Sequence, residues 1–123
     1  MKDQIDWRPI SPQETGVIRS ILLQADIRRS GPLIADLDGA LVANETTWIL
    51  NVKVSNKGDG TDLPNGPFPA QAFVPNSAEY QGEVIIWLTD GHLSGLEYAW
   101  VSDSPPTRWP RADEMEVVPQ AIS

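Results

Sequence analysis

The clearest pattern in the chain is an apolar stripe at helical spacing near its start. Its members recur every three or four positions: Val17, Ile18, Ile21, Leu22 and Ala25. Just before the stripe, Ser11 and Glu14 have the spacing of a capping box, in which each side chain bonds the backbone of the other residue. Arg28-Arg29 suits a last turn, and Ser30-Gly31-Pro32 ends the pattern. The spacing predicts a helix over residues 12–29.

Farther along, apolar and polar positions alternate, which is typical of strands. In Thr46–Val54, one face carries four apolar side chains: Trp48, Leu50, Val52 and Val54. Shorter strands are predicted at residues 40–43, 70–74 and 115–118. Pro69 and Pro75 flank the strand at residues 70–74 and favour an edge position for it. Residues 33–38 suit one short helical turn, and the glycine- and proline-rich residues 55–69 predict a loop.

Asp90-Gly91 lies between two β-rich runs, residues 83–89 and 92–101, and this arrangement predicts a hairpin with a type I′ turn. If the two strands pair without a bulge, which we call the simple register, Trp87 faces Ser94 and Glu97 lies opposite Val84. A bulge at Gly95 would shift the pairing by one residue and move the following side chains to the other face. In the simple register both faces are apolar enough to be covered, one by the helix and the other by a loop, the C-terminal segment or a partner.

This order of elements predicts an α+β domain, with one N-terminal helix packed on a mainly antiparallel sheet of about four to five strands. A chain of 123 residues is about one domain long, and no linker divides it. We therefore expect a single domain over residues 1–123, with residues 1–10 flexible.

Charge and composition exclude several function classes. Nine Lys and Arg against 17 Asp and Glu give a net charge of −8, which disfavours binding to nucleic acid or to an anionic membrane surface. The absence of cysteine excludes disulfides, thiol nucleophiles and thiolate metal sites. The chain has neither an apolar run of about 20 residues nor a signal-peptide pattern at its start, so we expect a soluble cytoplasmic protein.

Few residues suggest a catalytic or metal-binding role. Glu97 lies in the middle of a predicted strand, where partial desolvation would suit a general acid; alternatively it faces solvent or pairs with an arginine such as Arg108. His92 follows the hairpin turn, where we expect an exposed loop residue. Asp59 and Asp62 lack calcium-loop spacing and predict a solvated turn. No phosphate-loop motif is present. We therefore predict no catalytic residue, no metal site and no cofactor.

The five tryptophans are the strongest binding candidates. Trp48, Trp87 and Trp100 lie on predicted strands, and we expect at least two of them to be buried. Trp7 and Trp109 lie in irregular segments and are candidates for exposed anchors, although Trp109 could instead fold back over the sheet. Tryptophan and arginine are common at interface hot spots. The candidate binding residues are Trp109, Arg108, Trp7, Trp87, Trp100 and Glu97.

The segment Asp90–Trp100, with its DGxLSGLEYAW-like pattern, is followed by Asp103, Pro105-Pro106-Thr107 and Trp109-Pro110. Together with Leu63–Pro67 and Ala25-Asp26, this pattern resembles a family of small uncharacterised bacterial proteins. The likeness spans residues 17–118 and is best in the hairpin and the segment after it. The resemblance supports a real single domain. Because that family has no assigned activity, the resemblance adds no catalytic residue.

Three functions remain open. The first is a small acidic protein without enzymatic activity that binds a basic protein partner, in the manner of a nuclease inhibitor or an immunity protein. The second is a small-molecule-binding domain, in which the loop at residues 56–69 closes an aromatic pocket lined by some of Trp48, Trp87, Tyr98 and Trp100. The third is an enzyme that uses Glu97 with an aspartate. A homodimer built by the hairpin face is compatible with each.

Overall fold

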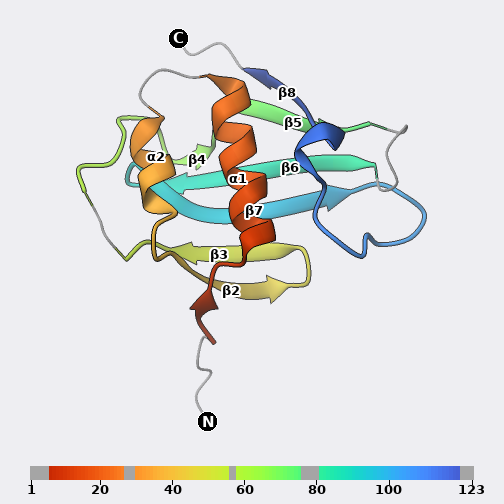
Figure 1. Ribbon diagram of the computed structural model, residues 1–123, viewed down its shortest axis with the longest axis horizontal. Coiled ribbons are helices and arrows are strands. Elements are labelled where there is room, and N and C mark those ends of the chain that lie inside the picture. The colour runs from red at the N-terminus through yellow and green to blue at the C-terminus, as the bar shows by residue number, and fades with distance from the viewer. Residues whose placement is uncertain (1–5, 27–29, 56–57, 76–80, 120–123) are drawn as a thin grey trace.

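The computed structural model describes residues 6–26, 30–55, 58–75 and 81–119. In this part of the chain, two helices lie against one face of an antiparallel sheet of eight strands (Figure 1). The helices are α1 (Pro12–Ala25) and α2 (Gly31–Asp36). The strands are β1 (Arg8–Pro9), β2 (Leu41–Thr46), β3 (Ile49–Lys53), β4 (Gly66–Pro67), β5 (Ala70–Val74), β6 (Gly82–Thr89), β7 (His92–Trp100) and β8 (Glu116–Pro119). A 3-10 turn, η1 (Ala112–Glu114), precedes β8.

The prediction of one helix on a sheet of four to five strands is therefore wrong. The sequence pattern missed β1 and β4 because each has two residues, too few to show an alternation. The helical turn expected at residues 33–38 corresponds to α2, which begins two residues earlier, at Gly31, and is a second helix rather than a single turn. Proline is suited to a first helical turn, and Pro32 occupies that position in α2.

Helix α1 begins as predicted and ends earlier than predicted. The capping box is confirmed: Glu14 N donates to Ser11 Oγ at 3.1 Å, and Ser11 N donates to Glu14 Oε1 at 2.9 Å. Arg8 adds two hydrogen bonds to the same carboxylate, at 3.0 and 2.8 Å. Burial alone would raise the pKa of Glu14, but these hydrogen bonds outweigh burial and lower the pKa. The helix ends where Asp26 takes a left-handed conformation, and Arg28-Arg29 lies outside the described residues.

The strand order along the sheet is β1-β2-β3-β7-β6-β5-β8, and β4 also pairs with β6. The segment predicted at residues 70–74 is β5, with the same bounds, but it is not an edge strand because β8 pairs along its other side. The inference from the prolines failed because Pro69 and Pro75 flank β5 rather than lie in it. The N–H groups of the strand itself stay available for pairing.

The hairpin of β6 and β7 is confirmed, in the bulged register. Asp90 and Gly91 both have positive φ, 54° and 80°, as a type I′ turn requires. Leu88 pairs with Leu93, but the next pair is Trp87 with Gly95, so one residue of β7 has no partner. The simple register is wrong beyond this point: Glu97 lies opposite Ile85 rather than Val84.

The core lies between the two helices and the face of the sheet that they cover. On the helices, its fully buried members include Ile18, Ile21, Leu22 and Leu33. The predicted inward face of β3 is confirmed by Leu50 and Val52, which are 2% and 7% exposed. Val84, Ile86, Leu96 and Tyr98 of the hairpin complete this face. The bulge thus moves Leu96 and Tyr98 inward, and it moves Glu97 to the opposite face.

Candidate protein-binding surface

The face of the sheet turned away from α1 and α2, which we call the outer face, is rich in apolar side chains. Strands place alternate residues on opposite faces, so the buried positions of each strand fix which residues point outward. Trp87 is 36% exposed, and Ile85, Ile49 and Phe73 are partly exposed. The two helices lie together on the other side of the sheet (Figure 1). The outer face therefore presents partly exposed apolar side chains on the central strands of the sheet.

Trp87 is held in place by its neighbours on β7. A Cβ at Gly95 would lie 3.3 Å from Trp87 Cβ and 3.4 Å from Trp87 Cδ1, so the tryptophan side chain lies across the glycine. The indole Nε1 of Trp87 donates a hydrogen bond to Glu97 Oε1 at 3.2 Å. A large side chain with a fixed orientation loses little conformational entropy on binding, which is why tryptophan makes good interface anchors.

Three surface hollows adjoin one another on this face. The largest, which we call the Glu97 groove, has a volume of ≈ 480 Å³. Its walls are Thr46, Thr47, Trp48, Ile49, Glu97, Tyr98, Ala99, Trp100 and Pro105. A second hollow, of ≈ 300 Å³, lies between Trp87 and Phe68, and a third, of ≈ 350 Å³, lies beside Phe73. Glu83 lines both smaller hollows, and Ala99 joins the third to the Glu97 groove.

The outer face carries uncompensated negative charge. Glu83 and Glu97 lie near its centre, and neither pairs with a cation among the described residues. The expected alternative in which Glu97 pairs with Arg108 is wrong. Arg108 donates instead to Glu114, at 2.7 and 2.8 Å. The surface is therefore both apolar and acidic.

The sequence-based candidates fall into two groups. Trp87 and Glu97 lie together on the outer face, joined by a hydrogen bond. Trp100 pairs with Gly82 and has the same orientation on β7 as Tyr98, so it lies on the opposite side of the strand from Glu97 and lines the Glu97 groove at the end of β7. Trp87 and Trp100 are 36% and 37% exposed and Trp48 is half-buried, so the expectation that at least two of these three are buried is wrong. Sequence reasoning missed Ile85 and Glu83 as outer-face residues. The sequence shows that they alternate with Val84 and Ile86, but it does not show which of the two faces the helices cover.

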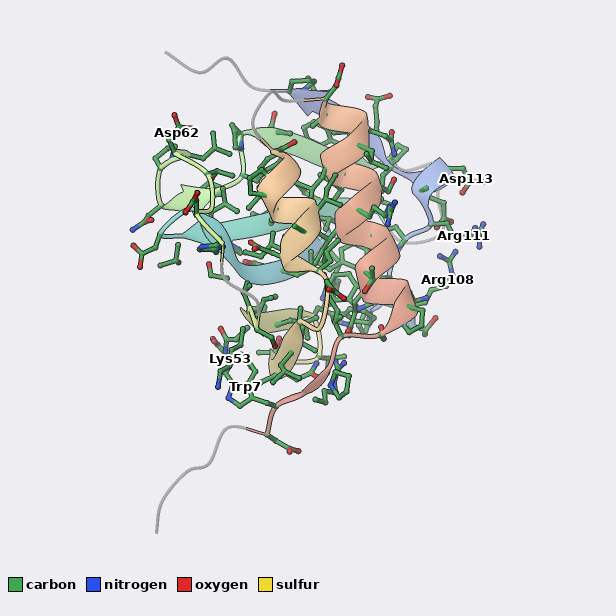
Figure 2. The ribbon with its side chains drawn as sticks, turned by 60° about the vertical axis from the view of Figure 1, so that its left-hand side comes forward. Trp7, Lys53, Asp62, Arg108, Arg111 and Asp113 are labelled. Carbon is green, nitrogen blue, oxygen red and sulfur yellow. The ribbon has the colours of Figure 1, made fainter. Side chains whose placement is uncertain are left out.

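Trp109 and Arg108 are not an exposed anchor pair. Trp109 is 5% exposed and packs edge-on against Trp48, with ring centroids 5.2 Å apart. It also stacks on Tyr98 at 5.9 Å. The alternative is therefore confirmed: Trp109 folds back over the sheet, because the proline-rich segment directs its ring inward. Arg108 lies beside it on the same segment, on the side of the molecule that Figure 2 shows with Arg111 and Asp113.

Exchanging Glu114 for glutamine should remove a pH dependence from the stability of the fold. The hydrogen bond from Arg108 lowers the pKa of Glu114 to about 2, whereas a glutamate in an unfolded chain has a pKa of about 4.3. The unfolded state therefore binds the proton first. The stabilisation is complete above about pH 5 and is lost as the pH falls toward 2. We expect wild type to lose about 2 kcal/mol more than Glu114→Gln between those limits, measured by urea unfolding.

The matched control is Glu116→Gln, an exposed glutamate that makes no ion pair among the described residues. Its unfolding free energy should follow that of wild type across the range. Parallel curves for wild type and Glu114→Gln would contradict the assignment.

Trp7 lies apart from the other candidates. The ammonium nitrogen of Lys53 lies 5.5 Å from the centroid of its ring, in a cation–π contact. Figure 2 shows the two side chains together at the end of the molecule away from Arg108. Trp7 is half-buried and contributes no wall to the three hollows. It is therefore not part of the outer-face surface.

A buried pair, Asp36 and His92, also had no signal in the sequence. His92 Nδ1 lies 3.0 and 3.2 Å from the two carboxylate oxygens of Asp36, and Leu93 N donates to Asp36 Oδ2 at 3.1 Å. His92 is 7% exposed, so its interpretation as an exposed loop residue is wrong. Its Nε2 packs against Gly60, where an added Cβ would lie 2.9 Å away. The pair joins α2 to the hairpin turn and is covered by the loop before β4.

The described part of the loop at residues 56–69 does not cover the Glu97 groove. Described residues of that loop lie at the other end of the hairpin: Thr61 N donates to Gly91 O, and Asn65 Oδ1 accepts from Asp90 N. Trp48, Tyr98 and Trp100 line the Glu97 groove, whereas Trp87 lines a separate hollow with Phe68 of the loop. Three of the four aromatic residues therefore share one hollow, and the fourth shares another with the loop.

Among the described residues, no group of three or more His, Asp or Glu side chains is placed to hold a metal ion. No helix in this part of the chain is long and apolar enough to cross a membrane. Comparison of the chain with protein-family models, with curated proteins and with solved structures found no match.

Proposed function

We propose that this protein binds another protein through its outer face, without catalysing a reaction, and that the target is basic. The observation that carries the proposal is the acidic, apolar outer face, with Trp87 fixed at its centre. Exposed apolar surface with adjoining hollows is typical of protein-binding sites. The concrete version that we favour is an inhibitor or immunity-type protein, which masks a basic enzyme.

The charge supports a basic target. The chain carries a net charge of −8, and Glu83 and Glu97 face outward without cations among the described residues. Carboxylates on a binding surface attract a cationic partner during diffusion and disfavour acidic ones. The same charge disfavours nucleic acid and anionic membranes as partners.

Trp87→Ala is expected to weaken target binding about 30-fold, which corresponds to about 2 kcal/mol. The target would first be captured from a lysate of the native host at low salt, then purified for measurement of the dissociation constant. The matched control is Leu23→Ala, which removes an exposed apolar side chain, 57% exposed, from the helical side of the fold. Wild type and Leu23→Ala should capture the same basic protein, and Trp87→Ala should lose it.

A second variant keeps the test independent of folding, because Trp87 also packs on Gly95. Glu83→Gln with Glu97→Gln removes two charges and keeps one side-chain oxygen at each position, so that the Trp87 indole retains an acceptor. Its association rate should be several-fold slower than that of wild type, and the wild-type rate should fall about tenfold or more when salt rises from low to high concentration.

Several outcomes would overturn the proposal. They are an absence of any basic partner, equal capture by wild type and Trp87→Ala, and an association rate that salt does not change. Concentration-dependent self-association that Trp87→Ala abolishes would also overturn it, because the outer face would then be the interface of a homodimer.

A further inference from the structure

The Glu97 groove combines two features that recognise one kind of side chain. Its walls come from the β2–β3 turn and from β7, and they include two tryptophans, Trp48 and Trp100. Glu97 also lines the groove, and its carboxylate accepts the hydrogen bond from Trp87 on the outer face. Aromatic faces attract cations through their quadrupole, and a carboxylate attracts them through its charge. A groove that offers both is suited to a cationic group with a flat face.

The aromatic wall is rigid. Trp48 packs edge-on against both Tyr98, at 5.7 Å, and Trp109, at 5.2 Å between ring centroids. Its backbone is tied to β7 by the hydrogen bond from Tyr98 N to Trp48 O, at 2.9 Å. Trp100 forms a more open part of the wall and is 37% exposed. The groove therefore presents preformed aromatic surface, which lowers the entropic cost of binding.

The charge of Glu97 is available to a ligand. Its Oε1 accepts a hydrogen bond from the indole of Trp87, and its other oxygen makes no hydrogen bond among the described residues. Several described cations are engaged elsewhere: Arg8 with Glu14, Lys53 with Trp7, and Arg108 and Arg111 with Glu114. A ligand with a positive charge could therefore pair with the carboxylate of Glu97.

We infer that the Glu97 groove binds the guanidinium group of an arginine from the target protein. A planar guanidinium stacks on an aromatic ring and donates hydrogen bonds to a carboxylate in the same plane, whereas a lysine ammonium is a strongly hydrated point charge. The inference rests on the proposed function and names the side chain that the target contributes. Trp87 and the smaller hollows then contact the apolar surface around that arginine.

The test uses a small probe and needs no target. Blocked arginine (N-acetyl-arginine methylamide) is titrated into the ¹⁵N-labelled protein, and the indole N–H signals are followed by NMR. Blocked citrulline, which has nearly the same shape and no charge, is the control ligand. We expect saturable shifts of the Trp48 and Trp100 signals with arginine, and binding at least about fivefold weaker with citrulline.

Two protein variants complete the design. Glu97→Gln keeps an acceptor for the Trp87 indole and removes the charge, so it should weaken arginine binding about fivefold. Glu116→Gln makes the same change on the edge strand β8 and should bind like wild type. Equal binding of arginine and citrulline, or no effect of Glu97→Gln, would overturn the inference.

The result separates this inference from the proposed function. If the arginine probe fails while target capture still depends on Trp87, the binding surface stands and the guanidinium site is wrong. If the probe binds as expected while no basic target is captured, the proposed function is wrong and the guanidinium site is supported.

Discussion

Replacing Asp36 with alanine is expected to lower the free energy of unfolding by about 3 to 4 kcal/mol. The Asp36 side chain is 3% exposed, and its carboxylate accepts hydrogen bonds from the ring of His92 and from Leu93 N. Alanine would leave both groups buried without an acceptor, and buried polar groups that lose their partner cost far more than the partner contributed. Urea unfolding, followed by tryptophan fluorescence, measures the loss.

Two variants separate this effect from a general intolerance of α2 to change. Asp36→Asn keeps the size of the side chain and one acceptor for Leu93 N, so its loss should be about half that of Asp36→Ala. Asp38→Ala changes an exposed aspartate two residues farther on, and it should alter stability by about 0.5 kcal/mol at most. A loss below about 1 kcal/mol for Asp36→Ala would contradict the role assigned to the pair.

The effect bears on function because of what Asp36 connects. Asp36 and His92 are 56 residues apart, and their contact fixes α2 to the start of β7. The same hairpin carries Trp87 and Glu97 on its outer face. Under the proposed function, Asp36→Ala should therefore reduce target binding only through loss of folded protein. Binding per folded molecule should stay unchanged.

Local signals in the sequence predicted local structure well. The Ser11–Glu14 capping box and the Asp90-Gly91 turn depend on neighbouring residues, and both are present. The bounds of β5 were also predicted, since alternation within a strand is visible in the chain. These elements follow from backbone preferences and side-chain spacing over a few residues.

Contacts between distant segments were not predictable in the same way. The register of β7 had two alternatives, and the pairing of Trp87 with Gly95 decides between them. The pairing of β8 with β5 and the contact between Asp36 and His92 join residues more than 40 positions apart, which leaves no pattern in a window of neighbouring residues. The candidate site was therefore only half predictable: Trp87, Trp100 and Glu97 were named, but the bulge decides that Glu97 shares a face with Trp87 and that Trp100 does not.

Replacing Gly91 with alanine is expected to lower the free energy of unfolding by about 3 kcal/mol, for two separate reasons. Gly91 has φ of +80°, which costs a residue with a side chain about 1 to 2 kcal/mol. An added Cβ would also lie 2.2 Å from Thr61 O and 2.9 Å from Thr61 N, so the backbone of the loop before β4 would have to move. That movement breaks the hydrogen bond from Thr61 N to Gly91 O, now 2.9 Å long.

Gly39→Ala separates the two costs. Gly39 has a similar positive φ, +72°, but an added Cβ there would meet only Ser55 Cβ, at 3.9 Å, so this variant should lose only the cost of backbone strain, about 1 kcal/mol. In Gly91→Ala, hydrogen exchange should also speed up at Thr61 and Leu63, because the loop leaves the hairpin turn. Equal losses for the two variants, with no faster exchange at Thr61, would mean that the loop is not fixed by the turn. A larger loss for Gly91→Ala, with faster exchange there, shows that the turn holds the loop over His92 and so keeps the buried pair with Asp36 from water.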